Sequence, residues 1–335
     1  MTIERKNWID WAKCIAITMV VLGHIPQGKG SFLPFYICIF HIPLFFFISG
    51  YLTKERTDTR EELNKCWHSL VIPYILYNII FYPYWAIRLH IDHGIDFSLF
   101  EYITKPILGI ILLQIDSPIS SKVNGAMWFI VVLLIMRLTI HLCFRSKKPV
   151  LYITIIALLF VGIFILTNGL NISLPLTIEG LIKCMPLYLL GYLTKHYRWI
   201  DNISRYKDIL GATLFISISI GVSFIYKSPR CFVYQISSFY IILITATYGF
   251  LFLCKVFNSI KSHIIVNISI GTLMIMGVHW MYIGTTNFIL EHLLSMNTGI
   301  AYSWPLAILF ALCINAAIYP LIIMAKKNIP VLLGK

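Results

Sequence analysis

The chain has 335 residues, of which 59% are hydrophobic and only 12% are charged. A soluble globular domain carries about 25% charged residues, so this composition excludes an ordinary soluble enzyme or binding module. The net charge of +13 would suggest a nucleic-acid partner in a soluble protein, but here the basic residues lie in short segments between apolar runs. We therefore expect a bilayer environment and no nucleic-acid partner.

Apolar runs of about 20 residues recur along the chain, which predicts an all-α polytopic membrane protein. The runs are continuously apolar instead of alternating, which disfavours membrane-spanning strands. No polar stretch is long enough to build a soluble core, so we expect a single membrane-embedded domain over 1–335. The ten predicted spans are 8–25, 32–52, 67–90, 126–144, 150–168, 179–194, 209–226, 232–254, 264–289 and 301–325.

The first predicted span contains Asp10, Lys13 and His24. These breaks in the apolar run, with no small-residue cleavage site after it, indicate a retained helix instead of a signal peptide. Lys13 and His24 are 11 residues apart, about 20° from a whole number of helical turns, so they share one face. Their axial separation of about 16 Å excludes an ion pair and suits the two ends of one long ligand. The alternative is an interfacial Asp10–Lys13 pair, with His24 ending the helix before Pro26.

The second predicted span contains His41 and ends in the run Phe45-Phe46-Phe47-Ile48-Ser49-Gly50-Tyr51-Leu52. Ionisable groups at membrane depth are costly and mark functional sites, which makes His41 a candidate site residue. Ser49-Gly50 permits a close approach of the backbone to another group. Plain helix packing is the alternative for Ser49-Gly50, and a buried structural hydrogen bond is the alternative for His41.

Other polar groups have simpler interpretations. The segment 53–66 reads as a charged, solvated loop, and 97–115 reads as a lip or re-entrant segment because Glu101 and Lys105-Pro106 interrupt it. Arg137 lies close enough to the end of its span to extend to the interface, and Lys183 can pair with Glu179 one turn earlier. No carboxylate or histidine pair has metal-ligand spacing, so no metal site is predicted.

The distribution of basic residues predicts the topology. Eighteen Lys and Arg residues lie in one alternate set of segments between spans and six lie in the other set. Cytoplasmic loops carry the excess of Lys and Arg, so both termini are predicted to be cytoplasmic. An even number of spans agrees with this assignment.

Several segments together resemble a known family. The pattern Asp10-x-x-Lys13, ten intervening residues and His24 is followed by His41-x-Pro43-x-Phe45-Phe46-Phe47-Ile48-Ser49-Gly50-Tyr51-Leu52. Weaker likenesses continue at 70–74, 127–130, 186–192 and 268–279. The whole set resembles the membrane acyltransferase-3 family, especially its fucose 4-O-acetylase-like and surface-polysaccharide O-acetyltransferase members.

The resemblance implies a bundle of about ten helices that moves an acyl group, usually acetyl from acetyl-CoA, onto a carbohydrate hydroxyl. It implies that His24 is the essential histidine and that Lys13 occupies the position of the family's basic residue, which is commonly arginine. This chain has His68-Ser69 where the family usually has a basic residue before the third-helix motif, so Lys65 is the candidate second contact to the donor phosphates. The resemblance also suggests that Trp128 and His279 line the cavity. An interfacial position beside aromatic residues is the alternative for His279.

These residues suggest a reaction in which a sugar hydroxyl attacks a thioester. An imidazole titrates near neutrality, so His24 is the candidate general base, while an acyl-histidine intermediate is an open alternative. His41, Ser49 or a nearby lysine are candidates to stabilise the tetrahedral intermediate. Acetyl-CoA is expected as a substrate and no bound cofactor is expected, in a multi-pass protein of the inner or plasma membrane. A transporter of glycans or lipid-linked sugars is the competing class, and a receptor or scaffold is a third.

Overall fold

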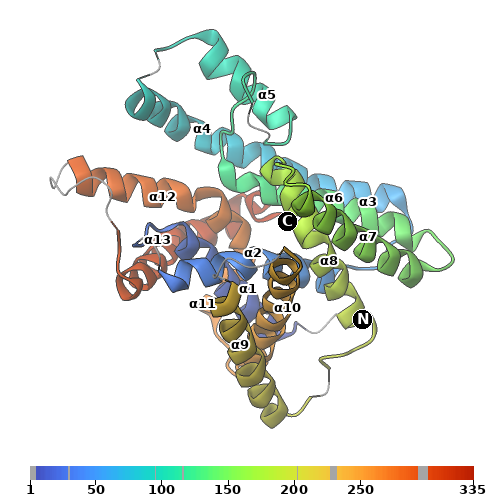
Figure 1. Ribbon diagram of the computed structural model, residues 1–335. Coiled ribbons are helices and arrows are strands. Elements are labelled where there is room, and N and C mark those ends of the chain that lie inside the picture. The colour runs from blue at the N-terminus through green and yellow to red at the C-terminus, as the bar shows by residue number, and fades with distance from the viewer. Residues whose placement is uncertain are drawn as a thin grey trace. The chain divides into compact units, whose positions relative to one another are not determined.

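The computed structural model describes residues 5–28, 31–94, 96–114, 117–201, 203–226, 232–292 and 301–335. Helices account for most of these ranges, and within them the only β-type pairings are two isolated bridges, Gln27 with Tyr302 and Ser117 with Ser120 (Figure 1). The predicted all-α class is confirmed.

Nine helical stretches in the described part of the chain are long and apolar enough to cross a membrane. The helices concerned are α2 (Phe32–Leu52), α3 with η1 and α4 (Thr59–Cys66, Trp67–Val71 and Ile72–His93), η3 with α6 (Gly125–Met127 and Trp128–Phe144), α7 (Pro149–Gly169), α8 (Leu176–His196), α9 (Arg205–Tyr226), α10 (Phe232–Val256), α12 (Thr272–His292) and α13 (Trp304–Asn328). The predicted first span forms an 18-residue helix, α1 (Asn7–His24). Its ionisable side chains lower its hydropathy, which separates it from the other nine.

The chain divides into two compact units. Unit 1 comprises Met1–Thr53, Pro186–Thr272 and Ile289–Pro320, and unit 2 comprises Lys54–Met185, Leu273–Phe288 and Leu321–Lys335. In unit 1, α1 packs against α2, α10 and the short helix α11 (His263–Ile270), and α10 packs along α9. Unit 1 therefore holds the helix that carries Lys13 and His24.

Unit 2 is tied together by buried polar contacts between its helices. The Tyr77 hydroxyl on α4 donates to the carbonyl of Leu332 in η4 (Pro330–Leu333), at 2.7 Å. The Asn124 amide donates to the carbonyl of Gly277 on α12, at 2.8 Å. Asn124 is fully buried, so these contacts satisfy backbone groups that water does not reach.

Two expectations about local structure need correction. The 53–66 segment is not a simple solvated loop, because Asp58 caps α3 by accepting from the Arg60 N–H at 2.9 Å and Glu62 is buried. The predicted 264–289 span is two helices, since α11 ends at Ile270 and α12 begins at Thr272, after Gly271. The 97–115 segment, which we expected to be a lip or re-entrant segment, contains two short helical pieces, η2 (Phe100–Thr104) and α5 (Lys105–Ile111), and its place relative to a bilayer stays a prediction.

Candidate active site

The α1 face that carries Lys13 and His24 is directed into the protein. Asp10, Ile17 and Val20 lie on or near this stripe and are buried, while Lys13 and His24 themselves are half-buried. The continuous helix Asn7–His24 puts both residues on one face, with about 16 Å of axial rise between them. This arrangement agrees with the helical spacing predicted from the sequence.

A backbone contact fixes the tautomer of His24. Its Nδ1 lies 2.7 Å from the carbonyl oxygen of Val20, one turn earlier. A carbonyl can only accept, so Nδ1 carries the proton and the lone pair of the neutral ring is on Nε2. A histidine held in this way has the form that can take a proton from a hydroxyl.

His41 has the same tautomer and lies beside His24 in unit 1. Its Nδ1 donates to the Ile37 carbonyl at 2.7 Å, and its buried Nε2 has no hydrogen-bond partner among the described residues. A Cβ atom built on Gly23 would lie 3.7 Å from Cε1 of His41, so the His41 ring rests against the residue before His24. In a neutral ring the Nε2 of His41 is an acceptor, which can hold a substrate hydroxyl.

Asp10 connects the N-terminal half of α1 to other residues through hydrogen bonds to its carboxylate. Arg5 donates to both of its carboxylate oxygens, at 2.7 and 2.6 Å, and the Ser269 hydroxyl on α11 donates to Oδ1 at 2.6 Å. Asp10 is 5% exposed, so this pairing compensates a buried charge. The sequence suggested Lys13 as an ion-pair partner, and neither Arg5 nor Ser269 was a candidate for this role.

Ser49-Gly50 lies at a close helix crossing. A Cβ atom on Gly50 would overlap the Tyr188 carbonyl oxygen of α8, and one on Gly191 would overlap the Phe47 carbonyl oxygen of α2. The two glycine-containing motifs therefore pack against each other within unit 1. This contact supports the helix-packing interpretation of Gly50. The half-buried Ser49 accepts at its carbonyl from Thr53 Oγ1, at 2.9 Å.

The other three predicted site residues lie in unit 2. Lys65 is exposed on α3. Trp128 packs on α8, where a Cβ atom on Gly180 would overlap the indole ring. His279 is fully buried on α12, and its Nδ1 lies 3.0 and 2.9 Å from the carbonyls of Ile275 and Met276. His279 is therefore enclosed by other protein atoms.

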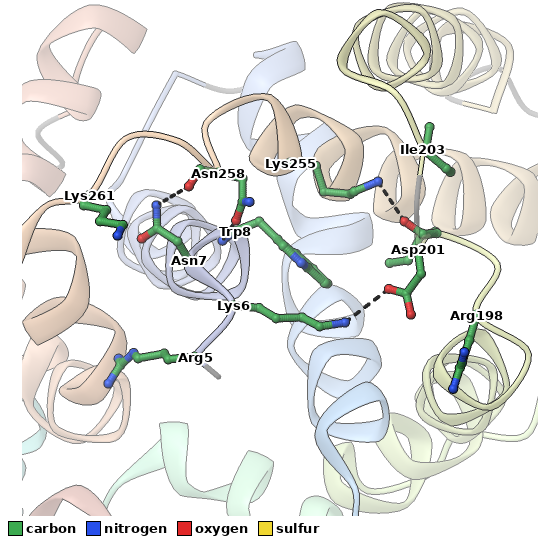
Figure 2. Close-up of a pocket in the computed structure, with 11 residues that line it drawn as sticks. Arg5, Lys6, Asn7, Trp8, Arg198, Asp201, Ile203, Lys255, Asn258 and Lys261 are labelled. Atoms are coloured by element: carbon green, nitrogen blue, oxygen red, sulfur yellow. Dashed lines mark hydrogen bonds and ion pairs between the residues drawn. The ribbon is translucent and has the colours of Figure 1, made fainter. Parts of the chain in front are cut away.

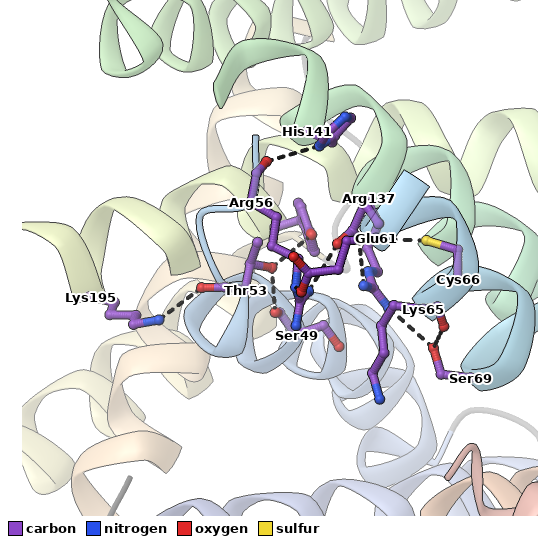
Figure 3. Close-up of polar contacts among 12 residues, drawn as sticks. Ser49, Thr53, Arg56, Glu61, Lys65, Cys66, Ser69, Arg137, His141 and Lys195 are labelled. Carbon is purple, nitrogen blue, oxygen red and sulfur yellow. Dashed lines mark hydrogen bonds and ion pairs between the residues drawn. The ribbon is translucent and has the colours of Figure 1, made fainter. Parts of the chain in front are cut away.

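A buried ion-pair cluster in unit 2 was not predicted from the sequence. The Glu62 carboxylate accepts from Arg56 at 2.9 Å and from Arg137 on α6, and Arg137 also donates to the Ser69 hydroxyl at 3.2 Å (Figure 3). We expected Arg137 to extend to the interface, but it pairs with Glu62. Lys183 pairs with Glu179, as its spacing suggested. Among the described residues, no group of three His, Cys, Asp or Glu side chains is arranged to hold a metal.

Comparison with known proteins gives the family. A family model described as an acyltransferase domain, Acyl_transf_3, matches residues 6–324. The chain is also similar to nodulation protein NolL of Mesorhizobium japonicum (strain LMG 29417 / CECT 9101 / MAFF 303099), with 25% identity over 249 residues that cover 70% of this chain. The match spans 60% of the length of that relative. No solved structure matches the chain. The chain therefore belongs to the Acyl_transf_3 family, and its described part has nine helices that are long and apolar enough to cross a membrane.

Proposed function

We propose that this acyltransferase moves an acetyl group from acetyl-CoA to a hydroxyl of a cell-surface or lipid-linked carbohydrate. The observation that carries the proposal is the imidazole of His24, whose Nδ1 donates to the Val20 carbonyl while its ring remains half-buried. It lies on the same helix face as Lys13, whose ammonium group we propose as a contact to a donor phosphate. The exposed Lys65 is proposed as a second donor contact.

In the proposed reaction, Nε2 of His24 takes the proton of the acceptor hydroxyl as its oxygen attacks the thioester carbonyl. The tetrahedral intermediate then collapses, the C–S bond breaks, and the CoA thiolate recovers the proton from the imidazolium. The products are the ester and free CoA, and His24 returns to its neutral form. Buried polar groups that do not move at the moment of reaction stabilise the developing charge most effectively.

His41 is proposed to position the acceptor. Its Nε2 is buried and accepts hydrogen bonds, so an acceptor hydroxyl donating to it is held beside His24. A route through an acyl group on Nε2 of His24 is the alternative, and it predicts an acylated protein when no acceptor is present. Trp128, His279 and Ser49 are proposed as supporting residues that shape the surroundings of the site.

The predicted location is the cell membrane, with both termini in the cytoplasm. The segments around 5–8, 198–203 and 255–261 were all assigned to the cytoplasmic side from their basic residues, and they meet around one pocket of unit 1 (Figure 2). A common side for these three segments supports the assigned topology.

The test is release of free CoA thiol from acetyl-CoA by membranes that contain the protein, together with mass spectrometry of the cell-surface glycans. Wild-type protein should release thiol in an acceptor-dependent manner and add the mass of one acetyl group to a glycan. The His24→Ala variant, present at equal amount, should do neither. Thiol release that continues unchanged in His24→Ala, or glycans identical with and without the protein, would contradict the proposal.

A further inference from the structure

A groove lies on unit 2, between the helical segment α3–η1 and α6. Its volume is 1020 Å³, and it is lined by residues of 58–71 on one side and by Leu134 and Leu138 on the other. The Thr59 hydroxyl lies 3.1 Å from Nε2 of His141, which is in the last turn of α6. The start of α3 is therefore held beside the end of α6, and the two sides of the groove run antiparallel.

One face of α3–η1 forms the first side of the groove. Arg60, Leu63, Asn64 and Trp67 line it, and their spacing of three, four and seven residues places them on one stripe of the helix. Lys65 is five residues after Arg60, which is about 140° around the helix, and it is not among the residues that line the groove. The groove is therefore separate from the lysine that we propose as a donor contact.

The polarity of the groove changes along its length. Asp58 and Arg60 lie at the end where α3 begins, and both are exposed. Val71 and Leu134 lie toward the other end, about 16 Å from Arg60 along the helix, in helical stretches that are long and apolar enough to cross a membrane. A ligand that matches both ends has a charged group and an apolar chain, as a phospholipid has. A free sugar or a polar peptide has no part that matches the apolar end.

Trp67 lies between the two ends of the groove. Its side chain is 52% exposed, and that of Leu63, one turn earlier, is 51% exposed. Tryptophan is enriched where lipid head groups meet the hydrocarbon, so we expect the indole at this level of the bilayer. Arg60 then lies about 10 Å further toward the aqueous side, in the head-group region, and Val71 lies in the hydrocarbon.

The charges at the polar end include both signs. Asp58, Arg60 and Glu61 line the groove there, and Glu61 is already paired with Arg56 at 2.7 Å. Asp58 accepts the Arg60 backbone N–H at 2.9 Å, which uses only one of the lone pairs of its carboxylate. The groove thus offers one guanidinium and one carboxylate, two residues apart. A guanidinium suits a phosphate, and a carboxylate suits a cation that donates hydrogen bonds.

We propose that this groove binds one phospholipid whose head group carries a primary ammonium, as in phosphatidylethanolamine. Arg60 contacts the phosphate, Asp58 accepts hydrogen bonds from the ammonium, and an acyl chain lies against Trp67, Leu134 and Leu138. A choline head group has a cation but no N–H to donate to Asp58, and a glycerol head group has no cation. The proposal concerns the lipid around unit 2 and stands independently of acetyl transfer.

The test is native mass spectrometry of the full-length protein released from nanodiscs that contain equal amounts of phosphatidylethanolamine, phosphatidylcholine and phosphatidylglycerol. The wild-type protein should retain phosphatidylethanolamine in at least about threefold excess over either of the other lipids, since two exposed charge contacts have an effect of about this size. Equal retention of the three lipids, or an excess of phosphatidylglycerol, would overturn the proposal.

The variant D58N/R60Q tests the contacts to the head group. Asparagine caps a helix as well as aspartate does, so α3 keeps its N-cap while the groove loses both charges. This variant should retain the three lipids in equal amounts. The matched control K54Q/E55Q removes one positive and one negative charge from exposed residues outside the groove, and it should keep the wild-type preference. A preference that persists in D58N/R60Q would show that the lipid is bound elsewhere.

Leu138→Trp tests the position of the acyl chain. The larger side chain occupies the apolar part of the groove, so the variant should lose the retained phosphatidylethanolamine. Leu158→Trp makes the same substitution at a residue of α7 that is 67% exposed, and it should retain the lipid. If the groove is instead an interface between two copies of the chain, the wild-type spectrum will show a dimer that Leu138→Trp dissociates and Leu158→Trp does not. That result would overturn the lipid assignment.

Discussion

His41 on α2 rests its imidazole against Gly23 of α1, the residue immediately before His24. Both rings donate Nδ1–H to the carbonyl one turn earlier on their own helix, so both present Nε2 as an acceptor in the neutral form. Because both rings have the same tautomer, mutation is needed to assign the base and the positioning residue.

Replacement of His24 by alanine is expected to lower acyl transfer by about 100- to 10,000-fold, the usual contribution of a general base. The measurement is acceptor-dependent thiol release, normalised to the amount of protein in the membrane. His263→Ala, which removes an exposed imidazole at the start of α11, is the matched control and should have wild-type activity. Activity retained in His24→Ala would exclude His24 as the base.

Replacement of His41 by alanine is expected to have a smaller effect, about tenfold, because it removes one hydrogen bond to the acceptor. The loss should be mainly a higher KM for the acceptor, with the KM for acetyl-CoA unchanged. His41→Gln retains an acceptor atom and should recover part of the loss. A loss in His41→Ala as large as that expected for His24→Ala, confined to kcat, would assign the base to His41.

The α2–α8 crossing should be sensitive to one added methyl group. Gly50→Ala and Gly191→Ala each place a Cβ atom where a backbone oxygen of the other helix lies, and overpacking of this kind costs about 1–3 kcal/mol or more. Gly162→Ala on α7, where no atom lies within 4 Å of the added Cβ, is the control and should be neutral or slightly stabilising. The unfolding temperature in detergent measures the change in stability of each of the three variants. Equal unfolding temperatures for all three variants would contradict the close crossing.

Glu62 should be far more sensitive than its neighbour Glu61. Glu62→Gln removes the buried carboxylate that pairs with Arg137 and leaves Arg56 with Glu61 alone, and breaking a buried pair costs about 3–5 kcal/mol. The Glu61 side chain is 61% exposed, so loss of its pairing with Arg56 is expected to cost less than about 1 kcal/mol. The unfolding temperatures of the Glu62 variant and of the corresponding Glu61 variant test this difference in stability. Similar values would show that the Glu62 cluster does not stabilise unit 2.

The sequence was sufficient for features that depend on periodicity and composition. Apolar runs of helical length predicted α1 and the nine long helical stretches found among the described residues, and the 11-residue spacing placed Lys13 and His24 on one face. It was insufficient where pairing depends on tertiary contacts. Glu62 appears in a charged, apparently solvated segment, and only the fold brings Arg137 from α6, about 75 residues later, to its carboxylate.

For the candidate site, too, the sequence predicted the residues but not their tertiary contacts. The ionisable residues of α1 and α2 were identified because charge is costly at membrane depth, but their hydrogen-bond partners are carbonyls of the same helix, which every helical sequence provides. Arg5 and Ser269 were missed as partners of Asp10, since Ser269 lies 259 residues away in sequence. The break at Gly271 between α11 and α12 was missed because the apolar pattern continues through it.

The close packing of α2 against α8 at Gly50 and Gly191 affects how the protein responds to the thickness of the bilayer. A backbone carbonyl group of each helix occupies the space beside the glycine of the other helix. Neither helix can therefore slide along its neighbour without a steric clash. His41 lies nine residues before Gly50 on the same helix, and its height relative to Tyr188 is thereby set. A thinner or thicker bilayer should tilt the two helices as one body, and the imidazole should keep its level within unit 1.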